Sequence, residues 1–168
     1  HQKISQTPPI HILNSLTNNL QKLTVLPKNL PQTSTNAQIF NNSAKDTYNN
    51  ALTWYVCGPT VYDSTHIGHA RTYTCFDLMR RVLERFFHIP MIYAMGVTDI
   101  DDKIIKRSQE KNINWQVLAR KFEIAFFDDL SRLNILPPHN ILRVSEHIND
   151  IIEYTTHLQK KGLAYTTN

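Results

Sequence analysis

A thiol and two imidazoles stand close together in residues 54–73, "WYVCGPTVYDSTHIGHARTY". Cys57 ends an apolar run, and His66 and His69 open the next helical pattern. Ligands of open α/β sheets bind outside the carboxyl ends of strands, and a helix amino terminus offers unpaired N–H groups and partial positive charge to phosphate. His66 and His69 are three residues apart and share one face, while Gly68 leaves room for a flat group against the backbone. The stretch therefore predicts an anion-binding site where the carboxyl end of a strand meets the amino terminus of the next helix.

The same residues permit other readings. A cysteine and two histidines could hold zinc with a water as fourth ligand, although the eight residues that separate Cys57 from His66 are not a usual structural zinc spacing. A strand cysteine is also commonly a small buried hydrophobe, and two histidines at a helix start are commonly part of a partly exposed surface. The residues alone leave these alternatives open.

Alternating elements are expected to position this stretch. The apolar run that begins at Leu52 is bounded by the turn signal "GPT", and we expect a helix from about Gly68 to Phe87. In that helix one apolar face is expected, formed by Met79, Val82, Leu83, Phe86 and Phe87. A second strand, residues 90–97, leads into the polar helix 102–111. Strand, helix, strand and helix in this order predict an α/β fold, a Rossmann-like parallel sheet with right-handed crossover helices.

Two later helices are expected. Asn114 can cap the first, which ends before Pro137 and has an apolar face of Leu118, Phe122, Phe126, Leu130 and Leu133. Ser145 can cap the second, which ends at Gly162 and should turn Ile148, Ile151, Ile152 and Leu158 inward. The final "LAYTTN" resembles the beginning of a strand that has no partner in this sequence, so we expect the protein to continue.

Composition excludes several classes of protein. The 168 residues are 41% apolar, enough for one ordinary core, and no window approaches the roughly 18 consecutive apolar residues of a membrane span. We therefore expect no membrane partner. Two cysteines are too few for a disulfide framework, and Cys75 is interpreted as a packing residue.

Three segments of the chain differ in composition and in hydrophobic pattern. Residues 1–26 are expected to contain an amino-terminal strand or hairpin, and residues 27–50 an Asn-rich disordered insertion. Residues 51–168 carry the alternating elements. The first 53 residues hold four lysines and Asp46 as their one acidic residue, and they contain no arginine; an acid-poor start suits material beside a mitochondrial targeting peptide.

Four sequence matches in chain order point to a family. "HIGH" at 66–69 resembles the signature of class I aminoacyl-tRNA synthetases, and "YVCGPTVYD" before it resembles cysteinyl-tRNA synthetases in particular. "GVTDIDDKIIKR" at 96–107 resembles the next strand-to-helix junction of that family, and "HILNSLT" at 11–17 its amino-terminal strand. The resemblance covers 52–164 almost without gaps. It implies the first half of a Rossmann-like catalytic domain, which leads into a connective segment.

The resemblance also implies a reaction and its residues. Cysteine would be activated by ATP, with Mg²⁺, to cysteinyl-adenylate and then transferred to tRNA(Cys). His66, Gly68 and His69 would bind ATP and stabilise the developing charge, and Cys57 would be one ligand of a Zn²⁺ that accepts the substrate thiolate. The other zinc ligands lie further along in the family. The chain also lacks the "KMSKS" loop and an anticodon-binding domain, so we expect no activity from it alone. The matching substrate contacts are Gly58, Thr60 and Thr98.

Some alternatives remain beside this resemblance. A cysteine:amino-sugar ligase and a non-catalytic, synthetase-like RNA-binding module share parts of the pattern. Asp101 and Asp102 are expected in a first helical turn rather than at a metal. Lys103, Lys106 and Arg107 favour a solvated helix face over a tRNA contact. The stretch "NILPPHNILRVSEHI" looks closer to mitochondrial members, so we expect the mitochondrial matrix, with the cytoplasm as second choice.

Overall fold

The computed structural model describes residues 9–23 and 51–167, so the expected insertion at 27–50 lies outside the described residues. The chain divides into two compact units, one formed by residues 1–54 and 78–92 and the other by 55–77 and 93–168. No helix in the described ranges combines the length and the hydropathy needed to cross a membrane.

The first unit contains an antiparallel hairpin, as the sequence predicted. Strands β1 (His11–Asn14) and β2 (Asn19–Lys22) pair with Asn14 opposite Asn19. Asn18 closes the turn in the left-handed region, with φ of 53°, which asparagine tolerates better than most residues.

The expected apolar face of residues 79–87 is only partly realised. Helix α2 (Ile67–Arg81) gives way to a π-helical turn, η2 (Val82–Phe86), which changes the number of residues per turn. The 3.6-residue spacing is therefore interrupted, and Met79, Val82 and Phe86 are exposed.

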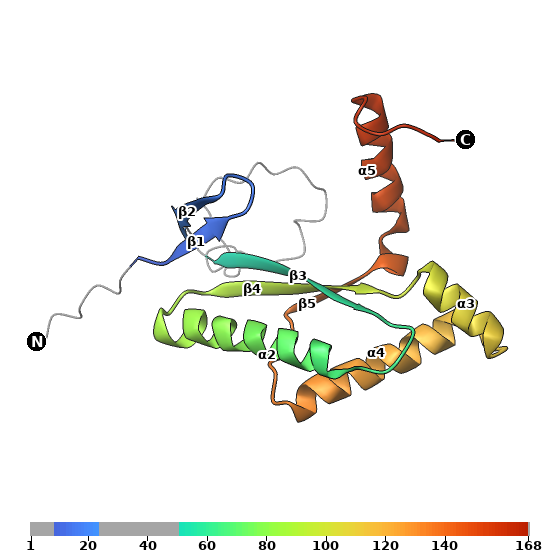
Figure 1. Cartoon of the computed structure of the whole chain (residues 1–168), viewed down its shortest axis with the longest axis horizontal. Helices are drawn as coiled ribbons and strands as arrows, with labels where there is room; N and C mark the ends of the chain where they lie inside the picture. The colour runs from blue at the N-terminus through green and yellow to red at the C-terminus, as the bar shows by residue number, and fades with distance from the viewer. Residues whose placement is uncertain (1–8, 24–50, 168) are drawn as a thin grey trace, which may run out of the picture. The chain divides into compact units, whose positions relative to one another are not determined.

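Three parallel strands form the sheet, in the order β3 (Leu52–Thr60), β4 (Met91–Thr98) and β5 (Asn140–Arg143) (Figure 1). β4 and β5 pair in parallel, with Ala94 opposite Asn140. The backbone N–H of Leu52 bonds the carbonyl of Pro90 at one end of β3, and that of Val61 bonds the carbonyl of Thr98 at the other, so β3 and β4 also run the same way. The predicted parallel α/β sheet is confirmed.

The expected turn at "GPT" is wrong, because β3 continues through Gly58 and Pro59 to Thr60. A proline cannot donate a ladder hydrogen bond and is confined to edge strands, first positions or bulges. β3 is an edge strand, so its ladder tolerates Pro59.

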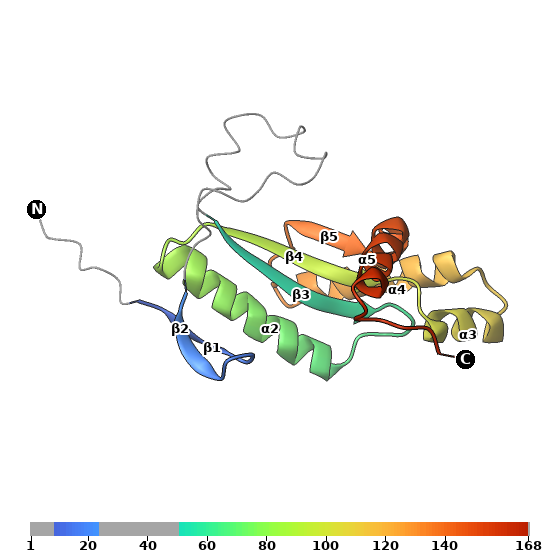
Figure 2. The same cartoon turned by 90° about the horizontal axis from the view of Figure 1, so that it is seen from above.

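Crossover helices cover one face of the sheet. Helices α2 and α4 (Trp115–Arg132) lie along that face, whereas α5 (Ile148–Lys160) rises on the other side (Figures 1 and 2). The core cluster joins the loop after β3, the end of β4, α3 (Asp102–Glu110) and α4 through Val61, Val97, Ile104, Leu118 and Ala119. Leu118, Phe126 and Leu130 of the expected α4 face are buried, whereas Leu133 is exposed.

Helix ends confirm some caps and correct others. Asn114 Oδ1 accepts the Gln116 N–H at 2.7 Å, so this cap is as predicted. Asp102 lies in the first turn of α3 as expected, whereas Asp101 is the N-cap, and its Oδ1 accepts the Lys103 N–H at 2.8 Å. Ser145 is not the cap of α5. It lies in the short 3-10 turn η3 (Val144–Glu146), where its backbone and hydroxyl groups bond Asp99.

Three further expectations fail near the surface. Cys75 is exposed, so it is not a packing residue, because its position on α2 points away from the sheet-covering side that buries Tyr73. Ile151 and Ile152 of α5 are exposed rather than turned inward. Residues 163–167 form no strand. Gly162 does end α5 in the left-handed region, with φ of 70°, as expected.

Candidate active site

A hollow of about 270 Å³ lies at the carboxyl ends of the three strands. Gly96 and Thr98 of β4 alternate with Met95 and Val97, which are buried on the helix-covered side, so the hollow opens on the other face of the sheet. Its remaining walls come from β3, β5, η3 and the start of α5; the full lining is Tyr55, Cys57, Gly58, Gly96, Val97, Thr98, Leu142, Arg143, Val144, His147 and Ile151. Three sequence-predicted residues, Cys57, Gly58 and Thr98, are therefore brought together. Thr60 is not among the lining residues.

Two glycines make room for this hollow. A Cβ on Gly58 would collide with the Gly96 carbonyl oxygen and come within 2.9 Å of Met95 Cγ. A Cβ on Gly96 would collide with the Tyr55 hydroxyl. The atom that a Gly58 side chain would strike is a backbone oxygen of β4, which cannot rotate away. A larger residue at Gly58 would therefore force β3 and β4 apart. The glycine type is thus required by close approach of β3 and β4.

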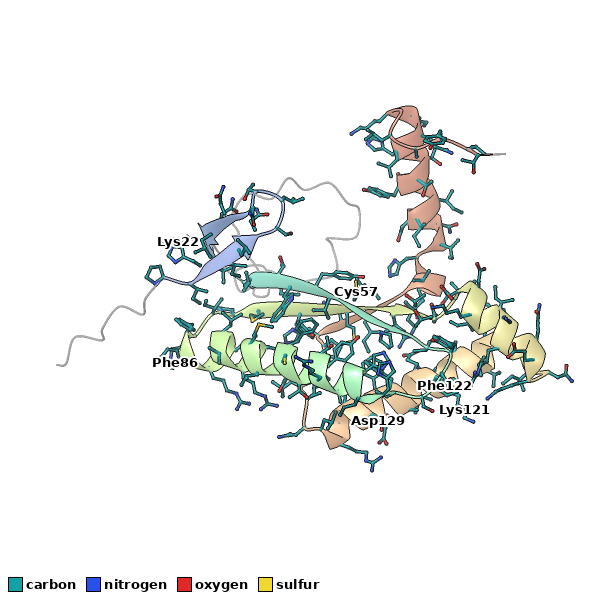
Figure 3. All side chains as sticks on the ribbon, viewed as in Figure 1. Lys22, Cys57, Phe86, Lys121, Phe122 and Asp129 are labelled. Carbon is teal, nitrogen blue, oxygen red and sulfur yellow. The ribbon has the colours of Figure 1, made fainter. Side chains whose placement is uncertain are left out.

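The side chain of Cys57 is exposed to solvent (Figure 3), whereas its backbone carbonyl is hydrogen-bonded to helix α2. The hydroxyl of Tyr73, on α2, donates to the Cys57 carbonyl at 3.0 Å. Tyr73 is only 4% exposed and packs edge-on against Phe126, with ring centroids 5.2 Å apart. Burial, followed by Tyr93 and Cys57, raises the pKa of Tyr73 to about 12, so its hydroxyl stays a donor at neutral pH. Sequence reasoning missed Tyr73, although its place one helical turn after His69 was a usable signal.

The two histidines form a stacked pair at the start of α2. Their ring centroids are 3.9 Å apart with an interplanar angle of 29°. Nδ1 of His66 accepts the Gly68 N–H at 3.1 Å, and Nδ1 of His69 accepts the His66 N–H at 3.3 Å. Since Nδ1 is an acceptor in both rings, each neutral imidazole carries its proton on Nε2. A Cβ on Gly68 would lie 2.9 Å from the His66 ring, so this glycine permits the folded-back ring.

The electrostatics of the helix start suit an anion. No acidic residue stands in the first turn of α2. The N–H groups of His66 and Gly68 are taken up by the two rings, so the rings themselves present the donors. Burial, and then the neighbouring His66, lower the pKa of His69 below its ordinary value of 6.5. His69 is therefore neutral at pH 7 and offers Nε2–H as a hydrogen-bond donor.

Helix α3 fastens the loop that joins Cys57 to the histidines. Arg107 pairs with Asp63 at 2.9 Å, and the Lys103 ammonium lies 5.6 Å from the Tyr62 ring centroid. Both Tyr62 and Asp63 belong to the β3–α2 loop. Lys103 and Lys106 are exposed, as expected for a solvated helix face. Arg107 departs from that expectation, because it is half-buried and paired with Asp63.

The residues that the structure describes do not complete a metal site. Within residues 9–23 and 51–167, no three His, Cys, Asp or Glu side chains are grouped so that they could hold an ion. The three-ligand alternative of Cys57, His66 and His69 is therefore wrong for the described residues. An exposed thiol at a strand end remains chemically suited to be one soft ligand of zinc.

The fold agrees with a comparison to known protein families. Residues 43–168 match the family model described as tRNA synthetases class I (C) catalytic domain. The match covers well over half of the chain, and the chain belongs to this family.

Its relatives narrow the class further. Dictyostelium discoideum "Cysteine--tRNA ligase, cytoplasmic" is 47% identical over 130 residues, which are 77% of this chain and 19% of that protein. "Probable cysteine--tRNA ligase, mitochondrial" of the same organism is 50% identical over 114 residues, 68% of this chain and 20% of the relative. "Cysteine--tRNA ligase" of Thermococcus kodakarensis is 52% identical over 111 residues, 66% of this chain and 23% of the relative. The chain thus spans about a fifth of the length of these curated relatives.

Proposed function

We propose that these residues form the part of a cysteine--tRNA ligase that activates L-cysteine with ATP and then serves transfer of cysteine to tRNA(Cys). One observation carries the proposal: the hollow beside Cys57 is joined, by a loop clamped to α3, to a helix start with two Nε2–H donors. The names of the relatives support the same reaction and favour it over a cysteine:amino-sugar ligase or a non-catalytic RNA-binding module.

The helix start would act on the phosphates. Attack of the cysteine carboxylate on the α-phosphate forms the acyl–phosphate bond, breaks the α–β phosphoanhydride and releases pyrophosphate. Negative charge grows on phosphate oxygens in the transition state, where the Nε2–H groups of His66 and His69 and the helix N–H groups can stabilise it. Neither histidine needs to transfer a proton. Gly68 seats the His66 ring against the backbone and would lie beside the bound nucleotide. Mg²⁺ would accompany the ATP.

The hollow would select the amino acid. We propose that Cys57 supplies one thiolate ligand to a Zn²⁺, with the remaining protein ligands contributed by a longer gene product. Bound there, zinc prefers a thiolate to a hydroxyl and so separates cysteine from serine. Gly58 and Thr98, which line the hollow, would contact the amino and carboxylate groups of the substrate. Thr60 stands at the end of β3, and we propose the same role for it.

We further propose a mitochondrial location, because the first 53 residues are nearly free of acidic side chains. Relatives bear both mitochondrial and cytoplasmic names. Fractionation of cells that express a carboxyl-terminally tagged gene product, with a protease-protection step, tests the location: recovery in the soluble cytoplasmic fraction contradicts it.

Cysteine-dependent ATP–pyrophosphate exchange tests the activity. The complete gene product that contains these 168 residues should exchange label only when cysteine is added, and serine should not replace cysteine. The 168-residue chain alone should show no exchange. A full-length protein that is folded but shows no cysteine-dependent exchange would contradict the proposed function.

A further inference from the structure

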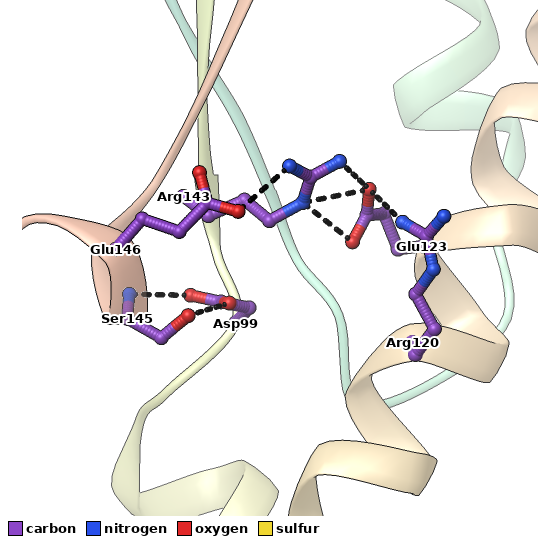
Figure 4. A network of polar contacts seen from close by, with 6 residues as sticks. All are labelled: Asp99, Arg120, Glu123, Arg143, Ser145 and Glu146. Carbon is purple, nitrogen blue, oxygen red and sulfur yellow. Dashed lines mark hydrogen bonds and ion pairs between the residues drawn. The ribbon is translucent and has the colours of Figure 1, made fainter.

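A buried carboxylate, Glu123, contacts Arg143, which is one of the residues that line the hollow (Figure 4). Glu123, on α4, is 2% exposed, and it receives Arg143, the last residue of β5, in a forked contact. Arg143 Nη2 lies 2.8 Å from Glu123 Oε1, and Nε lies 3.1 Å from both carboxylate oxygens. Arg120 adds a contact of 2.8 Å to Oε1 from the solvent side, with a side chain that is 60% exposed.

A second buried carboxylate ties the same segment to β4. Asp99 directly follows β4 and is 8% exposed. Its Oδ1 accepts the Ser145 N–H at 2.9 Å, and its Oδ2 accepts the Ser145 hydroxyl. Arg143 also contacts Glu146 of η3 at 3.0 Å. The end of β5 and the turn η3 are thus held by directional bonds to α4 and to the end of β4.

This fastened segment is a wall of the hollow that holds Cys57. Leu142, Arg143, Val144 and His147 all line it, and Thr98 of the hollow immediately precedes Asp99. Arg143 lines both this hollow and a separate polar one of about 420 Å³, which Asp99 and Glu123 also line. A buried carboxylate is costly unless it is paired in good geometry, so Glu123 and Asp99 permit few positions of Arg143 and Ser145.

We propose that Glu123 and Asp99 are positioning residues that set the shape of the cysteine pocket by holding residues 142–147. Neither carboxylate touches the substrate; each acts through Arg143 or Ser145. The inference rests on the proposed function, since it assigns the hollow to cysteine. It adds to that function that cysteine affinity depends on two residues that do not line the hollow, Glu123 on α4 and Asp99 directly after β4.

A split between two Michaelis constants separates positioning from simple stabilisation. The wall of residues 142–147 belongs to the hollow, and the histidine pair does not line it. Loss of positioning should therefore raise KM for cysteine and leave KM for ATP unchanged. Loss of stability alone lowers the amount of folded enzyme, which reduces the apparent kcat and leaves both KM values as they were.

Glu123→Gln in the complete gene product is the main variant, because it keeps the shape of the side chain and removes the charge that Arg143 requires. In cysteine-dependent ATP–pyrophosphate exchange, normalised to titrated active sites, we expect KM for cysteine to rise on the order of tenfold or more and KM for ATP to stay within about twofold. Glu123→Asp keeps the charge and should recover part of the affinity.

Two further variants keep the test decisive. Ser145→Ala removes only the hydroxyl that Asp99 accepts, so it should fold even where Glu123→Gln does not, with a smaller rise in KM for cysteine. Arg132→Gln changes the exposed Asp129–Arg132 pair of the same helix, whose atoms are 3.8 Å apart, and should change neither constant.

The outcomes are distinguishable. A selective rise in KM for cysteine in Glu123→Gln, or in Ser145→Ala where the first variant does not fold, supports the inference. Unchanged KM for cysteine in the folded variants, or an equal rise for ATP, overturns it while the proposed function stands. Absence of cysteine-dependent exchange in the wild-type protein removes the proposed function and this inference with it.

Discussion

Two regions of the site are built in opposite ways. The histidine pair is formed by four consecutive residues, 66–69, whose rings and N–H groups bond one another at an exposed helix start. The hollow beside Cys57 takes its walls from three strands, a 3-10 turn and α5, and two buried carboxylates stand behind one wall. A local device of this kind tolerates changes elsewhere in the fold, whereas the hollow depends on the packing of distant segments. Substitutions in the first region should therefore alter rate, and those in the second should alter affinity or stability.

The largest effect is expected at the histidine pair. His69→Ala removes an Nε2–H donor aimed at developing charge, and the rate of cysteine-dependent exchange should fall by about 10²- to 10³-fold. KM for cysteine should change little, because His69 does not line the hollow. His69→Gln, which retains an N–H donor, is the matched control and should recover part of the rate. A rate for His69→Ala within twofold of wild type would show that the pair does not stabilise the transition state.

A large but different effect is expected at Cys57. In the complete gene product, Cys57→Ser should lower zinc affinity by more than the 10- to 100-fold typical of outer-sphere changes, and it should reduce the preference for cysteine over serine. The melting temperature of the metal-free protein should hold, since the side chain is exposed. Cys75→Ser, on the exposed side of α2, is the matched control and should leave zinc content unchanged. Full zinc occupancy in Cys57→Ser would rule out ligation by this residue.

An intermediate effect should appear where the hollow depends on close strand approach. Gly58→Ala places a Cβ against the Gly96 carbonyl oxygen, so the free energy of unfolding should fall by about 1–3 kcal/mol. Thr53→Ala, at an exposed position of the same strand, should cost much less. Denaturant unfolding of the gene product measures both. Equal stability of Gly58→Ala and wild type would mean that β3 and β4 can separate without cost.

The smallest effect concerns proton binding. Because burial and His66 lower the pKa of His69, the folded protein binds this proton less readily than the unfolded chain. The contribution of His69 to stability is then complete above pH 6.5 and is lost as the pH falls through its folded-state pKa. An NMR titration should give a midpoint below 6.5, and His66→Gln should raise it only in part, since burial is the larger cause. A midpoint above 6.5 would contradict the lowered pKa of His69.

Local sequence patterns predicted the secondary-structure elements and the histidine pair. Alternating apolar runs predicted the parallel α/β order, a local side-chain bond made Asn114 a predictable cap, and the spacing of residues 66–69 placed the two histidines on one face. These features depend on neighbours within a few positions, so they are readable from a single chain.

The walls of the hollow depend on contacts between segments that are distant in the sequence. The sequence suggested Ser145 as a helix cap, but its hydroxyl and its backbone N–H both donate to the distant carboxylate of Asp99. Tyr73 beneath Cys57, and Arg143 on Glu123, likewise join residues that lie 16 and 20 positions apart. Such pairs form because buried donors and acceptors must find partners across packed elements, and no local pattern specifies which partner a buried group will meet.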